Sequence, residues 1–247
     1  MTLFLVTSIL PSISGKHRQM AMWEQITALG GLPFSSVLAF AIALSFLIGK
    51  THGWRLSVYW GLLFLGAMAI AAGSQIAFLG WGIGVERIAF AGFSGHATRA
   101  AAVFPVALFV VFAREKSWSG TLSVIVGVIA AALVAVSRVM IGAHSQSEAG
   151  AGFVLGLTVA ICFVRHIGKQ RANIMAAPLM VLCLAPFFSP TQPTTVNASM
   201  THQWLIGVSL KLSGHDRPYS RDDWERTRTP YVPPCTASRI RFGYLCM

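Results

Sequence analysis

Two short stretches of this sequence carry polar residues whose types and spacing suit the transfer of a phosphoryl group. In the first stretch, Ser94, Gly95 and His96 directly precede an apolar run. Serine is a favoured N-cap residue, and glycine lets the backbone approach a ligand closely. The free N–H groups at a helix N-terminus attract phosphate, so Ser94 and Gly95 predict an anion site. His96 would stand beside that site, where an imidazole can donate a proton.

The second stretch combines Arg138 with His144 and Glu148. His144 and Glu148 are four residues apart, a spacing that places both on one face of a helical turn. A carboxylate bonded to one ring nitrogen fixes the tautomer and leaves the other nitrogen free as a nucleophile. The planar fork of Arg138 can hold two phosphate oxygens. Together the two stretches predict a nucleophile, an orienting acid, a proton donor and a phosphate clamp.

The elements that must position these residues are membrane spans. The chain has 247 residues, of which 55% are hydrophobic and only 11% are charged, whereas soluble domains carry about 25% charged residues. The apolar residues form long blocks that approach the roughly 20 residues needed to cross a bilayer. We therefore expect an all-α fold, a polytopic transmembrane bundle of about six helices. The expected spans are Leu32–Ile48, Leu56–Ala77, Ala97–Ala113, Leu122–Val136, Ala149–Val164 and Ile174–Phe188.

Composition changes along the chain divide it into three parts. We interpret residues 1–21 as an N-terminal extension, with the natural start near Met20 or Met22, and residues 22–188 as a transmembrane domain that contains both polar stretches. Trp23–Gly31 is typical of a short interfacial segment. The tail, residues 189–247, is rich in Pro, Thr, Arg and Asp, and we expect it to be mostly irregular and outside the membrane. Small residues within the spans predict close helix packing, among them Gly150, Gly152 and Gly156.

Basic residues orient the bundle. The net charge is +11, but the basic residues are scattered and form no stripe with interleaved aromatics, so we expect no nucleic-acid partner. The loops at Lys50–Arg55, Arg114–Lys116 and Arg165–Arg171 hold seven Lys or Arg, whereas Phe78–His96 and Ser137–Glu148 hold only Arg87 and Arg138. The positive-inside rule places the first set in the cytoplasm. Both polar stretches and both termini then face outward, which predicts a bacterial-type cytoplasmic (inner) membrane protein with an outward-facing site.

The pattern of the two polar stretches resembles the type 2 phosphatidic acid phosphatase superfamily. Ser-Gly-His before a span is followed, about 40 residues later, by Ser-Arg, five residues, His, three residues and an acid. The resemblance covers residues 23–188. It implies a magnesium-independent membrane phosphatase with a phosphohistidine intermediate, a lipid phosphate or pyrophosphate as substrate, and no cofactor or metal.

The same resemblance implies a role for each residue of the two stretches. Arg138 and the Ser94–Gly95 turn would bind phosphate, and His96 would protonate the leaving oxygen. His144 would attack phosphorus while Glu148 orients its ring.

The sequence departs from the family pattern at three places. Phe93 replaces a proline, and Glu148 replaces an aspartate. The family's first motif, Lys, six residues and Arg-Pro, has become Gln75 followed by Gly82-Ile83 at the corresponding position. Losing two cations weakens the electrostatic stabilisation of a transferring phosphoryl group. Activity is then either reduced or restored by other cations, with Arg87, Arg99 and Arg217 as candidates.

Three other functions compete with a lipid phosphatase. The degenerate first motif also fits a catalytically weakened or inactive relative that only binds phospholipid. His96 and His144 could instead be paired ligands of a haem electron carrier. A transporter is disfavoured because charges are absent from the middle of the expected spans.

Overall fold

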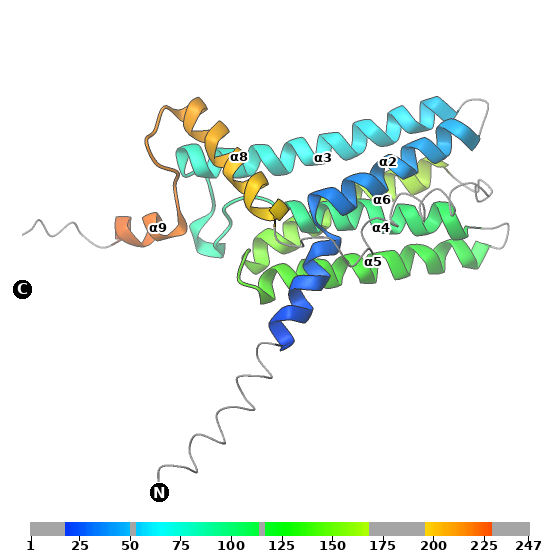
Figure 1. Cartoon of the computed structure of the whole chain (residues 1–247), viewed down its shortest axis with the longest axis horizontal. Helices are drawn as coiled ribbons and strands as arrows, with labels where there is room; N and C mark the ends of the chain where they lie inside the picture. Colours follow the sequence, from blue (N-terminus) through cyan, green and yellow to red (C-terminus); the bar gives the residue numbers. More distant parts are fainter. Residues whose placement is uncertain (1–17, 50–52, 114–116, 168–195, 229–247) are drawn as a thin grey trace, which may run out of the picture.

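The computed structural model describes residues 18–49, 53–113, 117–167 and 196–228, and these residues are almost entirely helical (Figure 1). A helix over residues 18–29 leads through the Gly30–Gly31 turn into the helices of the bundle. These are α2 (Leu32–Gly49), α3 (Gly53–Trp81), α4 (Gly95–Phe112), α5 (Ser117–Met140) and α6 (Gln146–Ile167), with a short 3-10 helix η1 (Glu86–Ile88) before α4 and helices α8 (Val196–Ser213) and α9 (Arg221–Arg228) after α6.

The predicted all-helical membrane bundle is confirmed. Within the described ranges, five helical segments are long and apolar enough to cross a membrane: Arg18–Ile48, Gly53–Trp81, Gly95–Phe112, Trp118–Met140 and Gln146–Ile167. They correspond to the first five expected spans and extend most of them by a few residues. The sixth expected span, Ile174–Phe188, lies outside the described residues. The expected interfacial segment before Leu32 is helical and forms one apolar unit with α2.

The described part of the tail, residues 196–228, contains two helices, α8 and α9, within a segment expected to be mostly irregular. In the sequence of α8, polar residues such as Asn197 and His202 interrupt the apolar ones. The sequence therefore did not indicate this helix of 18 residues. Helix α8 packs against α3, and it is this tertiary contact that favours the helix, since polar short helices are marginal by themselves.

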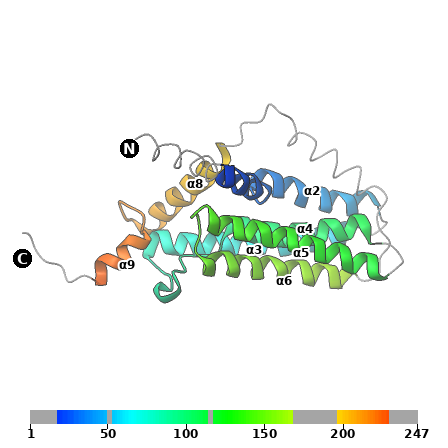
Figure 2. The same ribbon diagram turned by 90° about the horizontal axis from the view of Figure 1, so that it is seen from below.

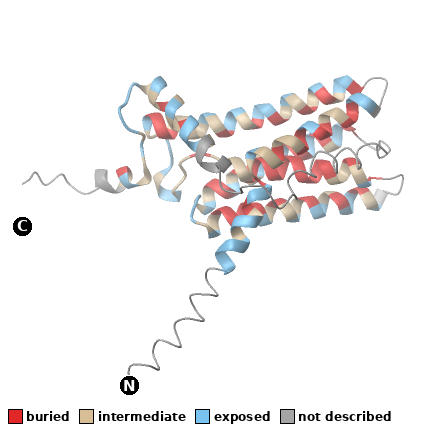
Figure 3. Cartoon of the chain, viewed as in Figure 1, coloured by how far each residue is buried: buried red, intermediate tan, exposed pale blue. Residues whose placement is uncertain are grey.

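Helix α4 lies at the centre of the bundle. It packs chiefly against α5 and α6 and also contacts α2 and α3 (Figures 1 and 2). Most of its residues are buried, including an unbroken run from Ala97 to Ala107. The other spans have exposed residues on their outer faces (Figure 3). Many of these residues are apolar, such as Leu62 and Leu65 of α3 and Ile129 and Leu133 of α5. Apolar side chains on the outer face of the bundle suit a protein that is surrounded by lipid.

Two glycines of α6 let this helix approach the first turns of α4. A Cβ added at Gly152 would lie 2.6 Å from the carbonyl oxygen of Ser94, and one at Gly156 would collide with the carbonyl oxygen of Thr98. The prediction of close packing at these two residues is confirmed. It is wrong for Gly150, where a Cβ would meet nothing within 4 Å. Gly152 and Gly156 therefore determine how closely α6 crosses α4, next to the predicted anion site at the start of α4.

Replacing Gly156 by valine is expected to destabilise the bundle by about 1–3 kcal/mol, the usual cost of forcing methyl groups into a packed contact. Thermal unfolding in detergent measures the effect. Gly150→Val is the matched control, because it adds the same side chain to the same helix in open space. Equal melting temperatures for the two variants would contradict the assignment of the close crossing to Gly156.

The two polar stretches lie at the same end of the bundle. The segment between α3 and α4 and the turn between α5 and α6 are joined there by the hydrogen bond from Ala91 N–H to the Glu148 carboxylate. Helix α9 of the tail contacts the same carboxylate, so the prediction that the tail lies on the side of the site is confirmed. The described residues that border the basic segments lie at the opposite end of these helices: the end of α2 and start of α3, the end of α4 and start of α5, and the end of α6.

Candidate active site

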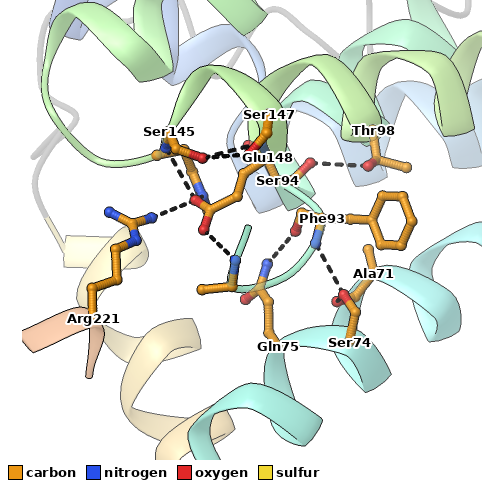
Figure 4. Close-up of polar contacts among 12 residues, drawn as sticks. Ala71, Ser74, Gln75, Phe93, Ser94, Thr98, Ser145, Ser147, Glu148 and Arg221 are labelled. Atoms are coloured by element: carbon orange, nitrogen blue, oxygen red, sulfur yellow. Dashed lines mark hydrogen bonds and ion pairs between the residues drawn. The ribbon is translucent and has the colours of Figure 1, made fainter. Parts of the chain in front are cut away.

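The N-terminus of α4 is held in place by neighbours from two other helices (Figure 4). Ser94 is the N-cap, and its backbone N–H donates to the carbonyl oxygen of Glu148 at 3.1 Å. From the end of α3, Ser74 Oγ accepts the Phe93 N–H at 3.0 Å, and Gln75 Nε2 donates to the Phe93 carbonyl at 2.6 Å. Gln75, at the position of the missing lysine, thus fixes the backbone that enters α4.

The turn between α5 and α6 folds back onto the end of α5. The carbonyl oxygen of Arg138 accepts the backbone N–H groups of Ala143 and His144, at 3.1 and 3.2 Å. Gly142 has φ of +70°, a conformation that favours glycine. The five residues between Arg138 and His144 therefore form a compact turn that sets both side chains at one end of the bundle.

Glu148 is the polar centre of this end. Its side chain is 1% exposed, and Oε2 lies 2.8 Å from His144 Nδ1. The Ala91 N–H donates to Oε1 at 2.8 Å, and the Ser145 N–H donates to Oε2 at 3.1 Å. Ser145 Oγ in turn accepts the Glu148 N–H at 3.3 Å, which completes a capping box at the start of α6. Because an ionised carboxylate only accepts, the His144 proton belongs on Nδ1 and its Nε2 is left with a lone pair.

Positive groups gather beside this pair. His96 Nδ1 lies 3.4 Å from a guanidinium nitrogen of Arg99. Arg99 is buried, donates from Nε to the Gly30 carbonyl at 3.1 Å, and lies beside Gly95. Arg138 ends α5 and adjoins the compact turn that carries His144. Arg99 and Arg138 thus bring two guanidinium groups to the end of the bundle that holds one buried carboxylate, and this positive charge favours an anion.

Two buried polar atoms at this end have no hydrogen-bond partner among the described residues. They are Ser94 Oγ and Arg138 Nε. Buried donors that stay unpaired are uncommon and costly. Both atoms are donors, and both belong to residues that are predicted to bind phosphate. The oxygens of a bound phosphate could accept a hydrogen bond from each of them.

The structure does not bring to the site all of the arginines that were expected to replace the cations of the first motif. Arg87 is exposed in η1. Arg217 is 66% exposed and pairs with Asp223 in the tail. The tail instead presents Arg221, whose guanidinium forms an ion pair with Glu148 Oε2. No feature of the sequence singled out Arg221, because its contact joins residues 73 positions apart.

A family model agrees with the chemistry of this end. The model described as the PAP2 superfamily matches residues 85–172, a range that contains both polar stretches. A second finding extends the similarity over most of the chain. An uncharacterised 22.5 kDa protein in the cps region of Klebsiella pneumoniae is 36% identical over 213 residues, which cover 81% of this chain and 96% of that protein.

The chain belongs to the PAP2 superfamily. The resemblance to type 2 phosphatidic acid phosphatases, with a degenerate first motif, is therefore confirmed. PAP2 membership supports a phosphatase-type function in general. Together with the five apolar helices, it indicates a protein that is embedded in a membrane. No solved structure matches this PAP2 protein significantly.

Proposed function

We propose that this PAP2 protein hydrolyses a lipid phosphate or pyrophosphate through a phosphohistidine intermediate on His144. The observation that carries the proposal is the pairing of His144 with the buried Glu148, beside a group of cationic side chains at a helix N-terminus. This arrangement supplies a nucleophile whose tautomer is fixed and an electropositive space for the phosphoryl group.

The first chemical step forms a bond from His144 Nε2 to phosphorus and breaks the bond from phosphorus to the lipid oxygen. Arg138, Arg99, the hydroxyl of Ser94 and the backbone N–H of Gly95 hold the equatorial oxygens, where negative charge accumulates. His96 gives its proton to the leaving oxygen. Nδ1 of His96 faces the Arg99 guanidinium, so the transferred proton is the one on Nε2. The ring carries a proton on both nitrogens before this step and is neutral after it.

The second step regenerates the enzyme. Water attacks phosphorus, the bond to His144 Nε2 breaks, and His96 accepts the proton that the water loses. Glu148 keeps Nδ1 of His144 protonated throughout, so the same ring nitrogen serves as nucleophile and leaving group. Inorganic phosphate then leaves the cationic site.

A lipid substrate suits the surroundings of the site. The end of α3 and the segment between α3 and α4, next to the proposed phosphate site, expose large apolar side chains, namely Trp81, Ile83, Val85 and Ile88. Exposed apolar groups at the end of membrane spans favour contact with lipid at the interface. A head group can then reach the cations while its chains stay in the bilayer. By the charge asymmetry of the loops, we place the site on the outer side of a bacterial cytoplasmic membrane.

The test is release of inorganic phosphate from a panel of lipids by the purified protein in detergent. The panel contains phosphatidic acid and a prenyl pyrophosphate, and the His144→Ala variant, purified in parallel, is the blank. We expect the wild type to hydrolyse at least one lipid well above the blank. Equal rates with every lipid would reject catalysis and leave the phospholipid-binding alternative. A haem absorption band in the purified protein would instead support the electron carrier.

A further inference from the structure

The tail of this protein is anchored to the end of α3 next to the site. The backbone N–H of Tyr219 donates to the Leu79 carbonyl at 2.9 Å. The ring N–H of His215 donates to the Gly80 carbonyl at 2.7 Å. The rings of Trp224 and Phe78 pack edge to face, with centroids 5.1 Å apart. These contacts set the start of α9 beside the candidate active site.

The first turn of α9 is stabilised by its own capping group. Asp223 Oδ2 accepts the N–H of Ser220 at 2.8 Å, and Oδ1 pairs with Arg217 at 3.1 Å. The backbone N–H of Ser220, aided by Arg217, holds the pKa of Asp223 below its usual value. The carboxylate therefore stays ionised, and the cap intact, until the pH falls through that lowered pKa. Arg221 is the first residue of this capped turn.

Arg221 extends from α9 to Glu148 (Figure 4). Its NH2 donates to Oε2, the oxygen that also accepts from His144 and Ser145. We propose that Arg221 is a positioning residue, which fixes the Glu148 carboxylate and, through it, the ring of His144. The inference rests on the proposed function, because it assigns the tail a part in the same reaction.

A positioning role follows from the length of the Glu148 side chain. Glutamate has one more rotatable bond than the aspartate usual in the family, so more freedom must be restricted to aim its carboxylate. The longer side chain reaches Ala91 and Arg221 as well as His144. Arg221 also brings a positive charge to a carboxylate that is 1% exposed, which offsets the cost of burying it. Glutamate and the tail arginine thus act as a pair.

Arg221→Ala is expected to lower kcat on the order of tenfold with KM unchanged, since a hydrogen bond to a charged group that orients the nucleophile is lost. Arg221→Lys, which keeps the charge, is expected to recover part of the rate. Lys211→Ala is the matched control, because Lys211 is an exposed basic residue of the same tail. An unchanged kcat in Arg221→Ala, or an increased one, would overturn the inference.

A double-mutant cycle separates positioning from a merely structural contact. In a Glu148→Gln background, Arg221→Ala is expected to reduce kcat by less than twofold, because its effect passes through the Glu148 carboxylate. Equal reductions in the two backgrounds would show that Arg221 acts elsewhere and would reject the role. Melting temperatures confirm that each variant is folded. If His144→Ala is inactive while Arg221→Ala matches wild type, only this inference fails and the proposed function stands.

Discussion

Alanine in place of His144 is expected to lower phosphate release by at least about a thousandfold, since removing a covalent nucleophile elsewhere costs up to about a millionfold. The backbone and arginine donors would still bind the substrate, so KM should change far less than kcat. The side chain of His144 is 18% exposed and pairs only with Glu148 among the contacts described, so the fold should tolerate its loss.

Trapping the intermediate gives a second measurement for His144. Wild-type protein quenched in alkali during turnover of a lipid labelled with ³²P in its phosphate should carry label that is stable in base and lost in acid, as a phosphohistidine is. His144→Ala should carry none. Label retained by His144→Ala, or hydrolysis by it at the wild-type rate, would place the nucleophile on another residue.

The second large effect is expected for Arg99. Arg99→Ala should reduce kcat/KM by roughly 10- to 150-fold, which corresponds to one charged hydrogen bond of about 1.5–3 kcal/mol. The substitution removes a cation from beside Gly95 and also the group that approaches Nδ1 of His96. Arg99 would in this way restore part of the positive charge that the first motif lacks.

Two further variants show whether the effect of Arg99→Ala comes from the charge and position of this guanidinium. Arg99→Lys keeps a positive charge but loses the fork that contacts both Gly30 and His96, so we expect an intermediate kcat/KM. Arg87→Ala removes an exposed cation from η1 and should leave the rate unchanged. A kcat/KM for Arg99→Ala within twofold of wild type would show that the buried guanidinium serves the fold alone.

Local spacing made much of the site predictable. His144 and Glu148 are joined within one turn at the start of α6, and the Ser94–His96 stretch begins α4, so short-range geometry placed their side chains. The small residues of α6 also indicated the crossing that brings the two stretches together. The roles of these residues stay predictions, while the contact between the stretches is present in the fold.

Long-range contacts explain what the sequence did not predict. Arg221 contacts Glu148 although the two residues are 73 positions apart in the sequence. Neither the residue types nor their spacing predict such a pair. Helix α8 is stabilised by packing on α3, which its mixed polar and apolar sequence does not encode locally. Arg217 was one of the three cations expected to restore positive charge at the site, yet it forms an ion pair with Asp223, six residues later.

The amino-terminal helix is tied to the catalytic end by side chains. Thr27 and Ser137 share a hydrogen bond of 2.6 Å, and the carbonyl of Gly30 accepts from Arg99 Nε. A shortened protein that starts at Leu32 would keep α2 to α6 but lose Gly30, whose carbonyl accepts from a buried guanidinium nitrogen, at a cost of about 1–3 kcal/mol. A version that starts at Met22 retains both ties. Where a recombinant chain begins consequently affects the surroundings of the proposed phosphate site.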